Sequence, residues 1–203
     1  MPAKNLLFAV VLGIALAAGI VVALRHTAAV DTPVAATVLP AAPALPPFRL
    51  VDDDGRDIGP EVFEGHWNLI FFGFTQCPDV CPLTLQTLSR ARAALAEAGE
   101  TPLPRIVLVS VDPERDTPER LAAYVDSFGS GTLGITGSLD EIRRLTDALG
   151  IYFAKVGEDA DTYTVDHSTA VLLIGPDGRY RAVFGGPHEL DNFVHDLPLV
   201  TGP

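Results

Sequence analysis

Two long apolar runs, separated by a helical pattern, constrain the fold of this chain more than any other feature. Residues 67–75 (WNLIFFGFT) and 105–111 (RIVLVSV) are almost continuous stretches of aliphatic and aromatic side chains. Such runs are typical of central strands buried on both faces of a helix-covered sheet. Residues 83–99 (LTLQTLSRARAALAEAG), which lie between them, have apolar side chains at helical spacing and end at Gly99. The sequence therefore predicts a strand–helix–strand unit of an α/β protein.

The remaining elements extend this unit into a layered domain. Further helices are predicted at 117–129, with Thr117 as N-cap and Pro118 as first helical residue, at 138–150, opened by a capping box from Ser138 to Glu141, and at 189–197. Strand patterns occupy 150–156, a hairpin at 169–184 that turns at Pro-Asp-Gly, and a short hairpin at 48–58 that turns at Asp-Gly. This order predicts a thioredoxin-like three-layer α/β sandwich with an N-terminal hairpin.

The chain begins with a candidate membrane segment. Leu6 to Leu24 is a run of 19 uncharged residues between Lys4 and Arg25. As a helix it would be about 28 Å long, close to the hydrocarbon thickness of a bilayer. A cleaved signal peptide ending near Thr27-Ala28-Ala29 is the alternative, but its apolar region is normally shorter. We therefore expect an uncleaved anchor in residues 1–25.

An Ala/Pro-rich stretch follows the apolar run. Residues 26–47 have no helical or strand period, which predicts a semi-rigid spacer ahead of a domain at 48–203. With either an anchor or a signal peptide, the domain is exported to an oxidising compartment. We expect a single-pass protein of a bacterial-type inner membrane, with its domain on the periplasmic side.

Charge and composition exclude some classes of function. The chain has 14 Lys and Arg against 26 Asp and Glu, a net charge of −12. Nucleic-acid binding requires a basic surface, so this balance argues against it. Met1 is the only methionine, which excludes a methionine-rich copper site.

The two cysteines, Cys77 and Cys81, lie where the first buried strand meets its helix. Either Pro78 or Pro82 could be the first helical residue. Backbone N–H groups at a helix start, together with the helix dipole, favour thiolates. Two thiols at this spacing can ligate a metal or form a disulfide, and ordinary buried thiols are the structural alternative. The spacing alone does not decide between metal and redox chemistry.

One of the five histidines has a distinctive position. His167 immediately precedes the apolar run at 169–174. Of the other four, His26 lies beside the anchor, His66 is a turn residue before the first buried strand, and His188 and His195 flank the polar side of the last helix, where a solvated histidine is the default. In a thioredoxin-like fold, the loop that enters this strand packs against the cysteine turn. Redox members usually have a cis-proline there, but this chain has no proline between Gly157 and Gly175. Two thiolates and one imidazole form a soft, low-coordinate ligand set that suits Cu(I).

Three segments carry a family resemblance. These segments resemble, in the same order, the signature segments of the Sco/SenC family: FFGFTQCPDVCP, VSVDPERDTPERL and VDHSTAVLLIGPDGR. The resemblance covers about residues 48–197. It implies a membrane-anchored copper metallochaperone for cytochrome c oxidase assembly, not an enzyme, with Cys77, Cys81 and His167 as copper ligands. The cargo would be Cu(I), and also Cu(II) if an oxygen or water ligand joins the site.

The resemblance also implies partners and leaves a second function open. The expected partners are the copper-binding subunit of the oxidase and a copper donor protein. The alternative is a thiol–disulfide reductase, with Cys77 and Cys81 as its reactive pair, that keeps the oxidase's copper-site cysteines reduced. Asp112 and Asp116 match acidic family positions. Two roles are open for these aspartates. One is local, with Asp116 capping the following helix, and the other is in partner recognition or beside the metal. Gln76 departs from the family, which often has His or an aromatic residue there.

Overall fold

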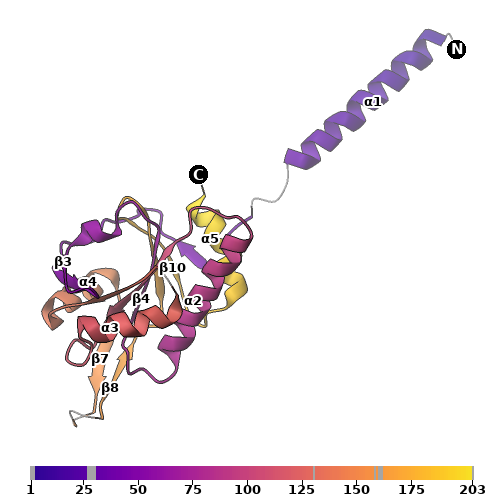
Figure 1. Ribbon diagram of the computed structural model, residues 1–203. Helices are drawn as coiled ribbons and strands as arrows, with labels where there is room; N and C mark the ends of the chain where they lie inside the picture. The colour runs from indigo at the N-terminus through magenta and orange to yellow at the C-terminus, as the bar shows by residue number, and fades with distance from the viewer. Residues whose placement is uncertain (1–2, 27–30, 130, 158, 160–161, 203) are drawn as a thin grey trace. The chain divides into compact units, whose positions relative to one another are not determined.

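The chain forms two units, Met1–Thr32 and Pro33–Pro203. The structure is a computed structural model that describes residues 3–26, 31–129, 131–157, 159 and 162–202. In the first unit, Ala3–His26 form one helix, α1 (Figure 1). No helix in the described part of the chain meets the length and apolarity needed to cross a membrane. The anchor stays a prediction, and the alternative cleavage site at 27–29 lies outside the described residues.

The second unit is built on an eight-stranded mixed sheet. Its strands, in spatial order, are β1 (Ala36–Val38), β10 (Tyr180–Phe184), β9 (Val171–Ile174), β4 (Asn68–Gly73), β5 (Arg105–Ser110), β6 (Thr132–Thr136), β2 (Leu50–Asp52) and β3 (Asp57–Ile58). β4, β5 and β6 are parallel, and the other pairings are antiparallel. All six residues of β4 are buried, as the run at 67–75 predicted. Both predicted hairpins are confirmed as β2–β3 and β9–β10.

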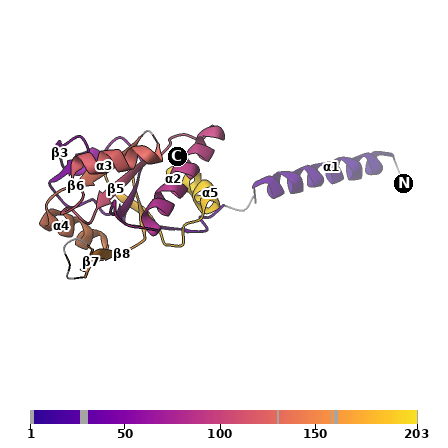
Figure 2. The same ribbon diagram turned by 60° about the horizontal axis from the view of Figure 1, so that its bottom comes forward.

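Helices cover the two faces of this sheet. They are α2 (Val80–Glu97), α3 (Pro118–Val125), α4 (Leu139–Leu149) and α5 (Leu190–Thr201), with short 3₁₀ helices at Pro60–Phe63 and Asp126–Phe128. α2 packs against α5, and α3 packs against β6. Figure 2 shows α3 and α4 on opposite sides of the sheet. The predicted three-layer α/β arrangement is therefore present, with the two apolar runs as β4 and β5 in the middle of the central layer.

The helix starts confirm part of the predicted chemistry. The Thr117 side chain accepts a hydrogen bond from the backbone N–H of Arg120, so Thr117 is the N-cap of α3. Ser138 accepts from the N–H of Glu141 in the same way. The Glu141 carboxylate does not complete the capping box. It accepts instead from the N–H of Arg49, 92 residues away in the sequence, and from the Arg144 guanidinium.

A separate two-stranded sheet projects from the domain (Figure 1). It consists of β7 (Phe153–Val156) and β8 (Thr164–His167), paired so that Phe153 faces His167. β7 matches the strand predicted at 150–156, whereas β8 and β6 were not predicted. β8 has the sequence TVDH, in which only Val165 is apolar, and β6 contains Gly134 and two threonines. Neither sequence has a strong strand pattern. Short strands of this kind are specified by their neighbours more than by their own composition.

The predicted spacer at 26–47 is wrong for its second half, because residues 34–45 pack on the domain. Residues 36–38 form β1 and pair with β10, and Leu45 is buried. The backbone N–H groups of Val34, Ala35 and Ala36 all donate to the carboxylate of Asp196, at 2.7–2.8 Å. Asp196 is fully buried in α5, so the pairing partner that orders this segment lies about 160 residues away.

This packing predicts that the stable domain begins at Pro33 and not at Phe48. A fragment 48–203 should have a free energy of unfolding about 3 kcal/mol below that of 33–203, because it loses the three hydrogen bonds to Asp196, strand β1 and the buried Leu45 side chain. Urea unfolding of the two fragments measures the difference. A third fragment starting at Asp31 serves as the length control and should match 33–203. Equal stability of 48–203 and 33–203 would show that the segment contributes nothing.

Candidate metal centre

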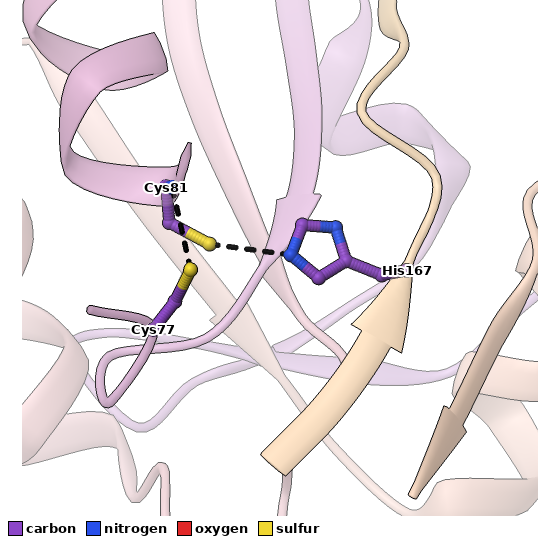
Figure 3. A group of neighbouring side chains, drawn as sticks. All are labelled: Cys77, Cys81 and His167. Carbon is purple, nitrogen blue, oxygen red and sulfur yellow. Dashed lines mark hydrogen bonds between the residues drawn. The ribbon is translucent and has the colours of Figure 1, made fainter. Parts of the chain in front are cut away.

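The cysteines lie at the junction of β4 and α2, as predicted, but the helix start differs from the expectation. α2 begins at Val80, with Asp79 as N-cap residue, so neither Pro78 nor Pro82 is the first helical residue. Proline lacks an N–H, and all N–H groups of the first helical turn are free of helical partners, so Pro82 fits inside that turn. Cys77 therefore lies in the turn before α2, and Cys81 lies in its first turn (Figure 3).

The end of β4 leaves room for the Cys81 sulfur. A β-carbon added at Gly73 would lie 2.8 Å from Cys81 Sγ, closer than real contacts allow. Glycine is therefore required for the close approach of this sulfur to the strand. The result is that Cys81 is fully buried, whereas Cys77 is 8% exposed. Both are free thiols.

The two sulfurs are coupled to each other and to the helix start. The N–H of Cys81 donates to Cys77 Sγ at 3.4 Å. A hydrogen bond from the Cys81 thiol is the largest cause that lowers the pKa of Cys77 from 9.0 to about 4, against the opposing effect of burial. The same bond, followed by burial, raises the pKa of Cys81 above its ordinary value of 9.0. At neutral pH the metal-free pair therefore holds one proton, on Cys81, and one negative charge, on Cys77.

His167 ends β8 and turns its ring toward the sulfurs (Figure 3). Its Nε2 lies 3.4 Å from Cys81 Sγ. Its Nδ1 lies 3.0 Å from the carbonyl oxygen of Ser168, which can only accept, so Nδ1 carries the proton and Nε2 offers a lone pair. The rings of Phe71 and Phe74 meet the imidazole edge-on, at 5.7 and 5.9 Å between centroids. Ring position and tautomer are therefore both fixed before any metal arrives.

The three ligand atoms can hold one metal ion. The sulfurs of Cys77 and Cys81 and the ring nitrogen of His167 all lie within 4.8 Å of one another. Metal–sulfur and metal–nitrogen bonds of about 2.0–2.3 Å place the ligands of a trigonal site roughly 3.5–4 Å apart. Only a small closure is needed to reach that spacing. A pocket lined by Cys77, His167, Asp79 and Asp166, among others, opens the site to solvent.

The other predicted residues have different roles. Asp116 does not cap α3. It accepts from the N–H and hydroxyl of Thr75, at 3.0 and 2.6 Å, and from the Ser110 hydroxyl at 2.7 Å. Asp112 accepts from the Tyr163 hydroxyl at 2.6 Å and from the Arg115 guanidinium. Both aspartates are buried and support the loops around the cysteines, without joining the three ligand atoms.

The remaining histidines lie outside the three-residue cluster. His66 is exposed, and His26 ends α1. His188 Nε2 lies 2.6 Å from the carbonyl of Thr169, and His195 Nδ1 lies 2.7 Å from the Asp196 carboxylate. None of these four is a predicted ligand. Ser168, Arg115 and Tyr163 are not predictable from the sequence, because their roles are backbone or long-range contacts that leave no local pattern.

Known proteins are similar to this chain over most of its length. A Stutzerimonas stutzeri protein is 37% identical over 163 residues, which are 80% of this chain and 79% of that protein. The chain spans only 44% of the mitochondrial SCO1 homolog 1 of Arabidopsis thaliana, at 37% identity. Among solved structures, copper-bound ScoI of Arabidopsis thaliana superimposes with a TM-score of 0.72 at 34% identity, covering 76% of this chain and 96% of that one.

A second similar structure is that of a protein described with a disulfide switch. BsSco, described with a disulfide switch and as a member of the Sco family of cytochrome c oxidase assembly proteins, superimposes with a TM-score of 0.62 at 25% identity, covering 80% of this chain and 96% of that one. These likenesses confirm the thioredoxin-like α/β fold of the family. The family model described as SCO1/SenC matches residues 36–200 of this sequence. Because that match covers most of its length, this chain belongs to the SCO1/SenC family.

Proposed function

We propose that this chain is a copper carrier that binds copper through Cys77, Cys81 and His167. The observation that carries the proposal is the fixed imidazole: Nε2 lies 3.4 Å from Cys81 Sγ while Nδ1 donates to Ser168. A thiol–disulfide exchange site needs only two sulfurs, so an imidazole locked with its lone pair toward them favours metal ligation. The soft donor set suits Cu(I), and Cu(II) would need a further oxygen ligand.

Transfer of the cargo follows from low coordination and access. Three protein ligands leave room for an incoming ligand, and the pocket beside Cys77 and His167 is open. A thiolate or imidazole of a partner can enter before the old bonds break. The proposed recipient is the exported copper-binding subunit of cytochrome c oxidase, and a second protein donates the copper. The assembly role stated for BsSco supports this direction.

The proposed location is a bacterial-type inner membrane, with residues 6–24 as a single-pass anchor and the domain on the periplasmic side. The support is the uncharged run from Leu6 to Leu24 within the helical segment Ala3–His26. Protease added to spheroplasts should remove the domain. A protease-resistant domain inside an intact bilayer would reverse this orientation.

The competing function is a thiol–disulfide reductase that keeps oxidase cysteines reduced. It is favoured by the lowered pKa of Cys77, which supplies an attacking thiolate, and by Cys81 as the resolving partner. In this function His167 would tune thiolate reactivity without holding a metal. The two functions therefore differ in what they require of the imidazole.

His167→Ala separates the two functions. We expect copper retention of the variant to fall steeply, because one of three metal bonds is removed, and cells grown at low copper should lose oxidase activity. Its Cys77–Cys81 disulfide should still form and exchange with an external thiol. The variant His66→Ala, at an exposed histidine, is the matched control and should behave as wild type. Normal oxidase activity from a His167→Ala protein that binds no copper would replace the carrier with the reductase.

A further inference from the structure

The ligand His167 is carried by an element that the main sheet does not hold. β7 and β8 pair with each other, and in the described residues neither is hydrogen-bonded as a strand to the eight-stranded sheet. The sulfurs, in contrast, lie at the junction of α2 with β4, a central strand of the main sheet. His167 is joined to β9 through residues 168–170, and Val165 is buried in the core, so side-chain contacts between the hairpin and the cysteine turn act together with these links to set the distance from imidazole to sulfurs.

One side chain makes this connection directly. Arg115 Nη1 donates to the side-chain oxygen of Gln76, at 3.2 Å, and to the backbone carbonyl of Tyr163, at 3.0 Å. Gln76 immediately precedes Cys77, and Tyr163 immediately precedes β8. The guanidinium Nε donates to the Asp112 carboxylate. The Arg115 side chain is only 13% exposed, and its bonds to Asp112 and Tyr163 are partly buried, whereas its bond to Gln76 lies at the surface.

Three further contacts hold the Tyr163 side chain. The Arg115 guanidinium carbon lies 3.6 Å from the centroid of its ring. The Tyr163 hydroxyl donates to the Asp112 carboxylate at 2.6 Å, so Asp112 accepts from both Arg115 and Tyr163. Lys155 of β7 also lies over this ring, at 3.8 Å. A planar guanidinium can stack on a ring and donate in its own plane at once, which an ammonium cannot do.

We infer that Arg115 is a positioning residue that clamps the β7–β8 hairpin to the cysteine turn and so sets the distance from His167 to the two sulfurs. This inference rests on the proposed copper-binding function. Arg115 touches none of the three ligand atoms and acts through Gln76 on one side and Tyr163 on the other. With the clamp intact, His167 is held beside the sulfurs before copper arrives. Without it, the hairpin must be ordered when copper binds, which weakens binding.

A double-mutant cycle tests the clamp on the purified reduced domain, with Cu(I) affinity measured by competition with a chromophoric chelator. Arg115→Gln should weaken Cu(I) binding by about tenfold, the range typical for loss of an outer-shell partner. In a His167→Ala background the same substitution should change affinity by less than about twofold, because there is no imidazole left to position. Arg115→Lys should not restore wild-type affinity. Arg144→Gln, at an arginine paired with Glu141 on α4, is the matched control and should be silent.

A readout without metal separates the clamp from the proposed function. Hydrogen exchange of the β8 amides, residues 164–167, should be faster in metal-free Arg115→Gln than in wild type, while exchange in β4 and β5 stays unchanged. Tyr163→Phe, which removes only the hydroxyl bond to Asp112, should shift affinity and exchange in the same direction by less. It carries the test if Arg115→Gln does not fold.

Three results would overturn the inference. Wild-type affinity in Arg115→Gln would show that the clamp is not needed. An equal loss with and without His167 would show that Arg115 acts on the sulfurs or on the whole domain. Unchanged β8 exchange would show that the hairpin is held by other contacts. If wild type itself bound no Cu(I), the proposed function would fail, and the exchange experiment would still decide whether Arg115 clamps the hairpin.

Discussion

Replacement of Cys81 by Ser is expected to abolish tight Cu(I) binding. The sulfur is fully buried between Cys77 and His167, so it is the central member of the ligand set. A serine hydroxyl is a hard, protonated ligand that Cu(I) binds poorly. Loss of an outer-shell partner typically costs about 10–100-fold in metal affinity, so loss of this ligand should cost more than about a hundredfold. Cys77→Ser should have an effect of similar size.

Chelator competition on reduced protein measures this loss. Thr87→Ser, a conservative change at a half-buried position on the same helix α2, is the matched control and should retain full affinity. Thermal unfolding of metal-free Cys81→Ser confirms that the domain is folded when it is tested. Near-normal Cu(I) affinity in folded Cys81→Ser would contradict the assigned ligand set.

Copper binding should release one proton and not two. In the metal-free pair, Cys77 is already a thiolate, since its pKa is about 4, whereas Cys81 is protonated because its pKa is raised above 9.0. Thiols must deprotonate to bind a metal, so only the Cys81 proton is displaced near neutral pH. Higher pH removes this competing proton, so the affinity for Cu(I) should increase as the pH rises. Between about pH 7 and 8.5, Cu(I) affinity should rise about tenfold per pH unit.

The pH dependence is measured by repeating the chelator competition across this range with a pH-corrected chelator. Two ordinary thiols with a pKa of 9.0 would release two protons, and affinity would then rise about a hundredfold per pH unit. A hundredfold slope would therefore show that the Cys81–Cys77 hydrogen bond does not hold Cys77 as a thiolate.

The central strands and helices were predictable because their signals are local. The apolar runs that became β4 and β5 leave no other placement than the middle of a covered sheet. Thr117 and Ser138 mark helix starts through bonds to residues three positions on. The placement of residues 34–45 on the domain, in contrast, was not predictable from local signals. Their Ala/Pro composition has no period, and they are ordered by the Asp196 carboxylate, which lies far away in the sequence.

The ligand residues of the candidate site were likewise predictable from local signals, whereas the contacts that position them were not. The cysteine spacing and the place of His167 before an apolar strand were visible in the sequence, and the family resemblance linked them. The geometry that makes the imidazole a ligand was not visible, because it depends on the Ser168 carbonyl. The Arg115 clamp was not visible either, because Arg115 lies 39 positions from Gln76 and 48 positions from Tyr163 in the sequence. No sequence motif marks such distant contacts. Asp116, interpreted as a possible helix cap, instead supports the strand end at Thr75.

X-ray absorption of the domain loaded with one equivalent of Cu(I) tests the central claim most directly. The geometry of Cys77, Cys81 and His167 predicts two sulfur ligands and one nitrogen ligand per copper. The nitrogen contribution should disappear in His167→Ala, leaving two sulfurs. A wild-type spectrum with two sulfurs and no nitrogen, unchanged by His167→Ala, would contradict the assignment of His167 as a copper ligand.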